Sequence, residues 1–151
     1  MTNYKTLAIN RKARFNYEIL DTFEAGLVLA GTEIKAMREG KANIGDAFAK
    51  PQDGEFWLLN AHIAQYSSGG ITNHDTDRPK KLLLHRTQIT QLTQGVNEKG
   101  LTVIPLKLYL KRHLAKVELG LARGRRQFDK RRAIIDKYRE REAREAIKRR
   151  L

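Results

Sequence analysis

Short runs of alternating apolar and polar residues dominate the first 122 positions, a pattern typical of β-strands that bury one face. The expected elements are strands at 17–20 and 27–29, a hairpin at 47–66, a loop at 67–81 and a second hairpin at 101–122. The polar stretch 21–26 separates the first two strands. Asp53-Gly54 is a strong turn signal in the first hairpin, and the second is expected to turn at 111–114. Trp57, in the run FWLL, is expected in the core.

Two segments follow the helical period instead. The first covers 31–42, with Thr32 as its N-cap and Gly40 as its stop. The second lies within 85–100 and is a short helix closed by Gly95. Short strands in hairpins with two or three short helices predict a mainly β fold, a small antiparallel OB-like β-barrel of five or six strands.

Beyond position 122 the alternation stops. Residues 123–151 contain no Pro and no Gly after Gly124, and they are rich in helix-forming Arg, Glu, Ala and Lys. The apolar positions form a stripe too thin to hold a helix on a core. These positions are Phe128, Ile134, Ile135, Tyr138, Ile147 and Leu151. We therefore expect two units: a barrel at 1–122, whose charge and motifs make it a candidate RNA-binding unit, and a helix-prone tail at 123–151 that is disordered or helical depending on its partner.

Charge separates the same two units. The formal net charge is +13. The tail holds 13 basic and 5 acidic side chains, a net of +8, and the first 122 residues hold the remaining +5. Such an excess indicates a polyanionic partner. A solvated terminal helix without a task is the plainer alternative for the tail.

Composition removes several classes of chemistry. The chain has no Cys, so disulfides, thiolate metal sites and thiol nucleophiles are excluded. No apolar run approaches the roughly 20 residues that span a bilayer, and no signal-peptide core follows the first Met, so we expect a cytoplasmic protein without a membrane partner.

No catalytic or metal-binding pattern is present in the sequence. The four histidines, at positions 62, 74, 85 and 113, have no metal-ligand spacing. Asp46, Glu55 and His74 could form a metal-dependent nuclease site only by converging in space, and nothing in their spacing supports that. We therefore expect a binding protein, with no catalytic residue, metal or cofactor.

Basic and aromatic residues are interleaved in two stretches, 10–17 and 123–131. Arginine binds phosphate through a bidentate fork, and aromatic rings stack on unpaired bases, so both stretches are candidate RNA contacts. For the first stretch there is an equal alternative: Phe15 and Tyr17 open a strand and point into the core. For Phe128 that alternative is weaker, because little apolar sequence surrounds it.

Six segments, in order and with spacing kept, carry a resemblance to a known family. They are N-R-K-A-R-F-N-Y (10–17), FEAG (23–26), GTEIKAMREGKANIGDAF (31–48), RPKKLLLHR (78–86), GLTVIPLKLYLK (100–111) and KVELGLARGRRQFDKR (116–131). The chain resembles the SsrA-binding proteins, also called small protein B, of bacterial trans-translation. The resemblance implies an OB-like barrel with a basic C-terminal tail and no enzymatic activity.

The resemblance also implies a function. Members of this family bind the tRNA-like domain of transfer-messenger RNA, assist its charging by alanyl-tRNA synthetase, and deliver it with elongation factor Tu to stalled ribosomes. There the tail occupies the empty mRNA channel next to the decoding centre. A monomer is expected. The alternative is a structural ribosomal or RNA-chaperone protein with the same barrel, which would be stoichiometric on translating ribosomes.

Matching positions imply the site residues. In the barrel set, Glu24, Leu83, His85 and Lys116 match family positions, and the basic loop residues Arg78, Lys80 and Lys81 are expected to join them. The tail set, which would act on the ribosome, is Arg123, Arg125, Arg126, Phe128, Asp129, Lys130 and Arg131. The sequence departs from the family pattern at Phe128, where relatives often have His or Tyr, and at the 111–114 turn, which lacks the usual glycine.

Overall fold

The computed structural model describes residues 4–66, 73–125 and 127–150, with side chains outside 127–133 and 148–150. In chain order the elements are β1 (Tyr4–Ile9), α1 (Ala13–Asn16), β2 (Tyr17–Leu27), α2 (Gly31–Arg38), β3 (Ala42–Asn43), β4 (Phe48–Gln52), β5 (Glu55–Leu59), β6 (His62–Ile63), β7 (Lys80–Leu83), α3 (Arg86–Lys99), β8 (Thr102–Lys111), β9 (Leu114–Gly124) and α4 (Gln127–Arg150).

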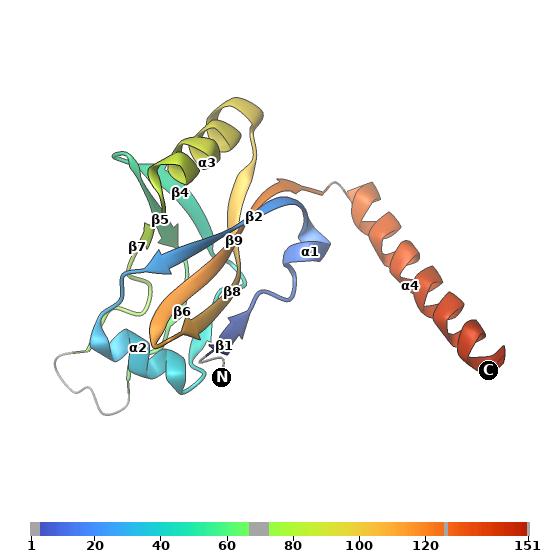
Figure 1. The fold of residues 1–151 in the computed structure, drawn as a ribbon, viewed down its shortest axis with the longest axis horizontal. Coiled ribbons are helices and arrows are strands. Elements are labelled where there is room, and N and C mark those ends of the chain that lie inside the picture. Colours follow the sequence, from blue (N-terminus) through green and yellow to red (C-terminus); the bar gives the residue numbers. More distant parts are fainter. Residues whose placement is uncertain (1–3, 67–72, 126, 151) are drawn as a thin grey trace.

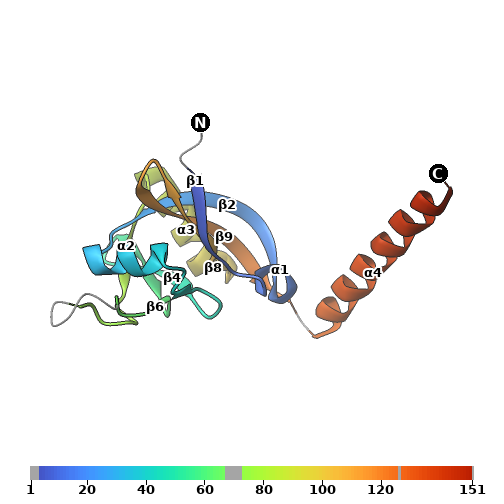
Figure 2. The ribbon, with the colours of Figure 1, turned by 90° about the horizontal axis from the view of Figure 1, so that it is seen from below.

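A closed antiparallel sheet forms the body. Within the described ranges, seven strands pair in the order β1-β8-β4-β5-β7-β2-β9, and β8 also pairs with β9, which closes the ring. Strand β1 pairs with residues 107–111 of β8, whereas β4 pairs with β8 at Val103. Helices α2 and α3 lie at opposite ends of this barrel, and α4 projects away from it (Figures 1 and 2). The predicted fold class, a mainly β barrel with short helices and a C-terminal helical tail, is confirmed.

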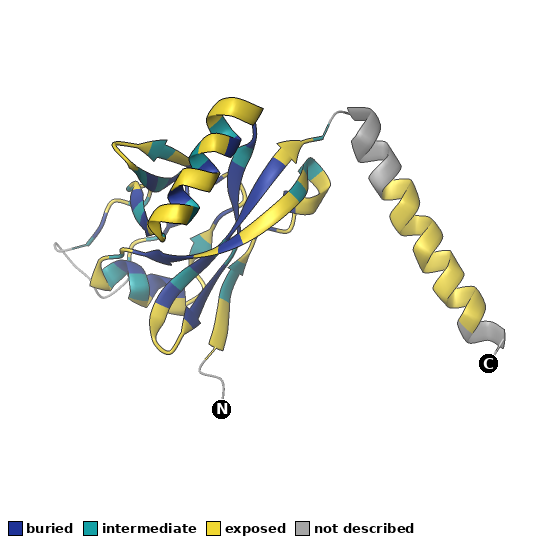
Figure 3. Ribbon diagram, turned by 45° about the horizontal axis from the view of Figure 1, so that its top comes forward, coloured by how far each residue is buried: buried dark blue, intermediate teal, exposed yellow. Residues whose placement is uncertain are grey.

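Strand alternation fills the barrel interior. On β5, Phe56 and Leu58 are fully buried, whereas Trp57 between them is half-buried and pairs with Lys50 and Lys81 on the outer face. The expectation that Trp57 lies in the core is therefore wrong, since its neighbours occupy the inward positions of the strand. Buried positions follow the barrel interior in Figure 3, while the described side chains of α4 are exposed.

The strand expected at 17–20 continues to Leu27, and Val28 and Leu29 of the second expected strand, 27–29, lie outside it. Strand β2 runs without interruption from Tyr17 to Leu27 because β9 pairs with it along its length, and a bulge between Ile19 and Asp21 absorbs the irregularity. In the stretch 21–26 that suggested a break, Asp21, Thr22 and Glu24 are exposed, and Phe23, Ala25 and Gly26 are buried. Tertiary pairing overrides the local composition here.

Both helices begin or end differently from the prediction. Helix α2 has Ala30, not Thr32, as its N-cap, and the Glu33 carboxylate accepts the Ala30 N–H at 2.8 Å. Gly40 follows its end with φ +77°, as expected of a stop. Helix α3 passes through Gly95, where a Cβ would lie 3.0 Å from Leu121 Cδ1, so the missing side chain lets the helix approach β9.

The turns of both predicted hairpins are confirmed. Asp53 and Gly54 have φ of 54° and 76°, and Arg112 and His113 have φ of 51° and 67°. These two-residue turns match the twist of the flanking strands. In the second turn two non-glycine residues adopt the left-handed conformation, held by the Lys111–Leu114 pair that closes the hairpin.

We predict opposite effects for two glycine substitutions in helices. Gly100 ends α3 with φ +64°, so Gly100→Ala is expected to lower the free energy of unfolding by about 1 kcal/mol. Gly31, in the first turn of α2, lies in open space without a positive φ, so Gly31→Ala should raise it by about 0.4–1 kcal/mol. Urea denaturation measures both. A lower free energy of unfolding for Gly31→Ala, or an unchanged one for Gly100→Ala, would contradict these backbone assignments.

Helix α4 occupies most of the predicted tail. Its described apolar side chains are exposed, such as Ile134 at 53% and Tyr138 at 62%, and these two line a shallow pocket with Phe15 of α1. Ion pairs Glu140–Arg144 at 3.6 Å and Arg141–Glu145 at 4.0 Å run along it. Strand β9 ends at Gly124, so Arg123 still belongs to the barrel strand. Order or disorder of the tail by itself stays a prediction.

Candidate nucleic-acid interface

A groove with a volume of about 420 Å³ lies on the outer face of the barrel beside the start of α3. The residues that line it are Glu24, Gly26, Glu55, Lys81, Leu83, Leu84, His85, Gln88 and Lys116. They come from β2, β5, β7, β9, the segment between β7 and α3, and the first turn of α3. Five residues of the predicted barrel set therefore meet at one surface: Glu24, Lys81, Leu83, His85 and Lys116.

The alternation of β7 decides which of its side chains enter the groove. Leu82 is fully buried, while Lys81 is half-buried and Leu83 is 53% exposed on the opposite side of the strand. Gly26 pairs with Leu83, and a Cβ at Gly26 would lie 3.1 Å from Leu83 Cβ. The absence of that side chain leaves room for Leu83 on the outer surface. His85, exposed, follows as the N-cap of α3.

The Glu24 carboxylate is fixed and charged. Tyr109 on β8 donates a hydrogen bond from its hydroxyl to Glu24 Oε2, and Lys111 Nζ lies 3.6 Å from Glu24 Oε1. The Tyr109 hydroxyl, aided by the charges of Lys111 and Lys116, lowers the pKa of Glu24 despite partial desolvation. Burial, with the hydrogen bond to Glu24, raises the pKa of Tyr109, so the phenol keeps its proton. Glu24 thus presents an ionised acceptor to the groove.

Two residues of the predicted barrel set lie elsewhere. Lys80 is fully buried, where Nζ donates to the carbonyls of Ala61 at 3.1 Å and Arg78 at 2.7 Å and lies 3.8 Å from Glu33 Oε2. Burial lowers the pKa of Lys80, and Glu33 opposes that shift. The assignment of Lys80 as a phosphate contact does not fit this geometry, because the side chain has no exposed surface.

Arg78 forms an ion pair with the same buried carboxylate, that of Glu33. Its Nη2 donates to Glu33 Oε1 at 2.5 Å and to the Val28 carbonyl at 3.3 Å. A guanidinium already paired with a buried carboxylate is a structural cation rather than a free phosphate ligand. The sequence shows the basic run at 78–81 but neither the ion pair of Arg78, which precedes β7, nor the opposite faces of β7 on which Lys80 and Lys81 lie.

The two basic-aromatic stretches meet at one end of the barrel. Tyr17 and Gly124 pair, Arg123 lies 3.7 Å from Glu18, and the Arg125 N–H donates to the Asn16 carbonyl at 2.9 Å. Although more than 100 residues apart in the chain, they form one surface. Phe15 is 41% exposed and Tyr17 packs on the cluster around Ile104, so the core alternative holds only for Tyr17.

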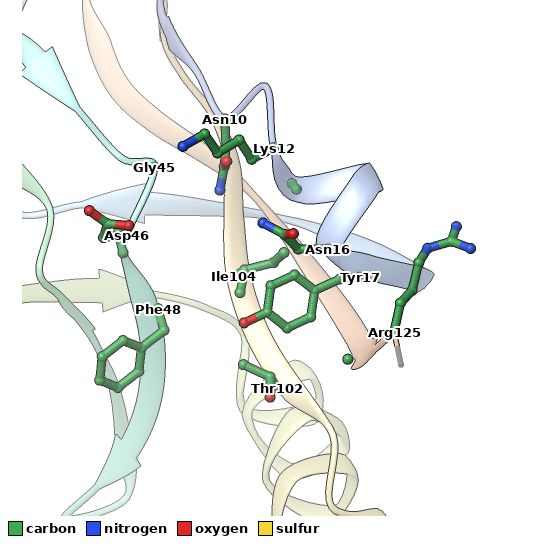
Figure 4. A pocket seen from close by; sticks show the side chains of 13 residues that line it. Asn10, Lys12, Asn16, Tyr17, Gly45, Asp46, Phe48, Thr102, Ile104 and Arg125 are labelled. Atoms are coloured by element: carbon green, nitrogen blue, oxygen red, sulfur yellow. The ribbon is translucent and has the colours of Figure 1, made fainter. Parts of the chain in front are cut away.

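This surface contains a second cavity with a volume of about 560 Å³ that sequence reasoning missed. In Figure 4, Asp46 and Phe48 lie across its opening from Asn10, Lys12 and Tyr17. Asn10 is buried, and its Nδ2 donates to the Pro105 carbonyl at 3.0 Å. Amide, hydroxyl and cationic groups therefore converge at this end. The basic run at 10–17 was its only sequence signal.

The tail set is described only in part. Arg123 and Arg125 lie at the end of β9 and directly after it. Arg126 lies outside the described residues, as do the side chains of Phe128, Asp129, Lys130 and Arg131.

The structure does not bring together the nuclease residues that the sequence left as an alternative. Asp46 lines the second cavity, Glu55 lines the groove, and buried His74 is hydrogen-bonded to Thr32 Oγ1 and the Ile63 carbonyl. Among the residues described, no group of three His, Asp or Glu side chains could hold a metal ion. The described helices include none with the length and hydropathy of a membrane span.

Comparisons with known proteins identify the family of this chain. The family described as SmpB protein matches residues 7–149. The chain is 51% identical to the SsrA-binding protein of Dehalococcoides mccartyi strain 195, covering 98% of this chain and 86% of that one. It is 50% identical to the SsrA-binding protein of Acidothermus cellulolyticus, covering 97% and 92%. A solved structure described as "tmRNA-SmpB: a journey to the center of the bacterial ribosome" is 46% identical with a TM-score of 0.69, covering 86% of this chain and 95% of that chain. The chain belongs to the SmpB family of SsrA-binding proteins.

Proposed function

We propose that this protein binds the tRNA-like domain of transfer-messenger RNA through the groove and delivers that RNA to stalled ribosomes in the cytoplasm. Alanyl-tRNA synthetase and elongation factor Tu are the expected companions on the way, and the protein acts as a monomer without catalytic chemistry. The observation that carries the proposal is the convergence of Glu24, Lys81, Leu83, His85 and Lys116 in one groove.

The groove combines the contacts that a folded RNA requires. Lys81 and Lys116 supply cations for phosphates, and exposed Leu83 supplies apolar surface for a base or ribose. His85 offers a ring or a hydrogen bond, and ionised Glu24 accepts from a base amino group or a 2′-hydroxyl. A polyanion bound only by charge would need neither Leu83 nor Glu24, so the mixed lining favours a specific RNA.

The barrel end formed by 10–17 and 123–125 supports a second contact. It lies at the opposite end of the β2–β9 pair from the groove residues Gly26 and Lys116, and α4 follows it in the chain. We propose that this end and the tail contact ribosomal RNA, with the tail in the empty mRNA channel. Ten of the 30 basic side chains lie in 129–151, which suits a channel walled by phosphates.

Salt dependence separates the two kinds of groove contact. Lys116→Ala should weaken binding to the isolated tRNA-like RNA and reduce the slope of log affinity against log salt by about one unit, because one phosphate contact is lost. Leu83→Ala should weaken binding at unchanged slope, because Leu83 carries no charge. Filter binding at several salt concentrations measures both. Equal slope changes for the two variants contradict the assigned roles.

The function itself is tested by purifying the tagged protein from cells and sequencing the RNA that accompanies it. We expect enrichment of transfer-messenger RNA, lost in Lys116→Ala, and association with stalled rather than translating ribosomes. Recovery of ribosomal RNA alone, in a constant ratio to all ribosomes, overturns the proposal and favours a structural ribosomal protein.

A further inference from the structure

A hydroxyl on another strand holds the Glu24 carboxylate from behind the groove. Glu24 is on β2 and Tyr109 is on β8, and β9 pairs with both strands. The Tyr109 hydroxyl nevertheless reaches Glu24 Oε2 and donates a hydrogen bond to it. The two residues are 85 positions apart in the chain, so no local pattern indicates the contact. Tyr109 does not line the groove, and its only access to a ligand there is through Glu24.

The Tyr109 side chain is fixed before any ligand arrives. It is 3% exposed, and its ring lies 4.8 Å from the ring of Tyr4, centroid to centroid. The Lys107 ammonium lies 5.4 Å from the Tyr109 ring centroid and 5.1 Å from that of Tyr4. An aromatic side chain covered in this way has one accessible rotamer, so its hydroxyl occupies one place.

The remaining acceptor capacity of Glu24 faces the groove. A carboxylate has about four acceptor positions, and the bond from Tyr109 uses one of them. Oε1 has Lys111 at 3.6 Å, an ion pair of two half-exposed side chains that an RNA donor can displace. Because the Glu24 side chain is 43% exposed and lines the groove, its free positions are open to a base amino group or a ribose hydroxyl.

We propose that Tyr109 is a positioning residue for RNA recognition: its hydroxyl fixes Glu24 as an ionised acceptor aimed into the groove. The inference rests on the RNA-binding function proposed above. Without the hydroxyl, the Glu24 side chain would sample other rotamers in the free protein. RNA binding would then have to fix it in one rotamer, and the conformational entropy lost in that step would reduce the affinity for RNA.

Charged groups on several strands act on the same carboxylate. Lys111 on β8 and Lys116 on β9 favour its ionised form, and Glu118 lies directly opposite Glu24 on β9. Lys107 lies 3.7 Å from Glu118 and offsets that charge. On the groove side the facing groups are Glu55, Lys81 and His85. Tyr109 is the largest influence in this set, and the pKa of Glu24 is lowered as a result.

The test is a double-mutant cycle on the full chain with the isolated tRNA-like RNA. Tyr109→Phe removes one oxygen from a buried ring, and we expect it to weaken binding about three- to tenfold at pH 7.5. In a Glu24→Gln background the same change should have no further effect, because Tyr109 acts only through the carboxylate. Tyr4→Phe is the matched control: it removes a neighbouring hydroxyl that does not contact Glu24, and we expect wild-type affinity.

The pH dependence of RNA affinity distinguishes loss of the hydroxyl from a packing defect, because a packing defect would leave that dependence unchanged. Loss of the hydroxyl is expected to raise the pKa of Glu24. The RNA affinity of Tyr109→Phe relative to that of the wild type should therefore decrease further as the pH falls from 7.5 toward 5. Every other ionisable group that lines the groove is common to both proteins, so its contribution cancels in the ratio. Carbon-13 NMR of the Glu24 carboxyl in the free protein should show its titration midpoint higher in Tyr109→Phe than in wild type.

Two results would overturn the proposal. One is wild-type affinity and an unshifted Glu24 midpoint in Tyr109→Phe. The other is an equal loss of affinity in the presence and absence of the Glu24 carboxylate. Failure of the proposed function would look different, because Lys116→Ala would then bind the RNA as the wild type does while the NMR midpoint still shifted.

Discussion

Deletion of residues 129–151 should abolish the tagging of stalled nascent chains while leaving the affinity for the tRNA-like RNA close to that of the full chain. The structure favours this separation, because the groove is built from β2, β5, β7 and β9, and none of its lining residues follows Lys116. The barrel also keeps its last contacts, since β9 ends at Gly124 and the Arg125 N–H bonds to Asn16.

The deletion removes ten basic and five acidic side chains, so a modest loss of non-specific RNA affinity at low salt is expected. A tail of the same length made of Gly and Ser is the control for chain length, and it should be as inactive in tagging as the deletion. Binding is measured by filter assay, and tagging in a reconstituted translation reaction stalled on an mRNA without a stop codon. Loss of RNA binding together with retained ribosomal rescue would reverse the proposed division of labour.

Replacement of Glu33 by Ala is expected to lower the free energy of unfolding by about 3–5 kcal/mol, the largest stability effect that we predict. Glu33 is fully buried and lies between two cations, with Arg78 Nη2 at 2.5 Å and Lys80 Nζ at 3.8 Å. Its removal leaves both cations without their carboxylate and removes the acceptor for the Ala30 N–H at the start of α2.

The matched control for this substitution is Glu39→Ala, just after the same helix. Glu39 pairs with Lys41 at 3.2 Å on the surface, where both side chains are well exposed, so its loss should cost no more than about 1 kcal/mol. Urea denaturation followed by circular dichroism measures both variants. Equal losses, or a Glu33→Ala protein as stable as wild type, would contradict the view that this buried carboxylate anchors β7 to α2.

Local patterns predicted the turns and the fold class, and both are confirmed. Asp53-Gly54 and the 111–114 turn could be located because two-residue hairpin turns depend on a few adjacent residues. The errors arose where a partner far away in sequence decides the conformation. Strand β2 continues through 21–26 because β9 pairs with it, and α3 passes Gly95 because Leu121 leaves only the space of a hydrogen atom there.

The candidate site divides in the same way. The resemblance supplied Glu24, Leu83, His85 and Lys116 by matching positions, and the structure places them in one groove. It could not separate Lys81 from Lys80, because adjacent residues on a strand point to opposite sides and only the closed barrel defines which side is the interior. Tyr109 carried no signal at all, since its partner is two strands away.

The sequence by itself determined that the chain carries a charge of +13, unevenly divided between a body of short alternating strands and a helix-forming tail, and that a polyanion is the partner. These properties depend on composition and on periods of two and 3.6 residues, which can be read along the chain. The tertiary structure alone decided which cations are available to that partner. Closing the barrel buried Lys80, paired Arg78 with Glu33, left Lys81 and Lys116 half-buried in the lining of the groove, and brought the two basic-aromatic ends together. Burial and pairing depend on contacts between residues up to about a hundred positions apart, and no local pattern contains them.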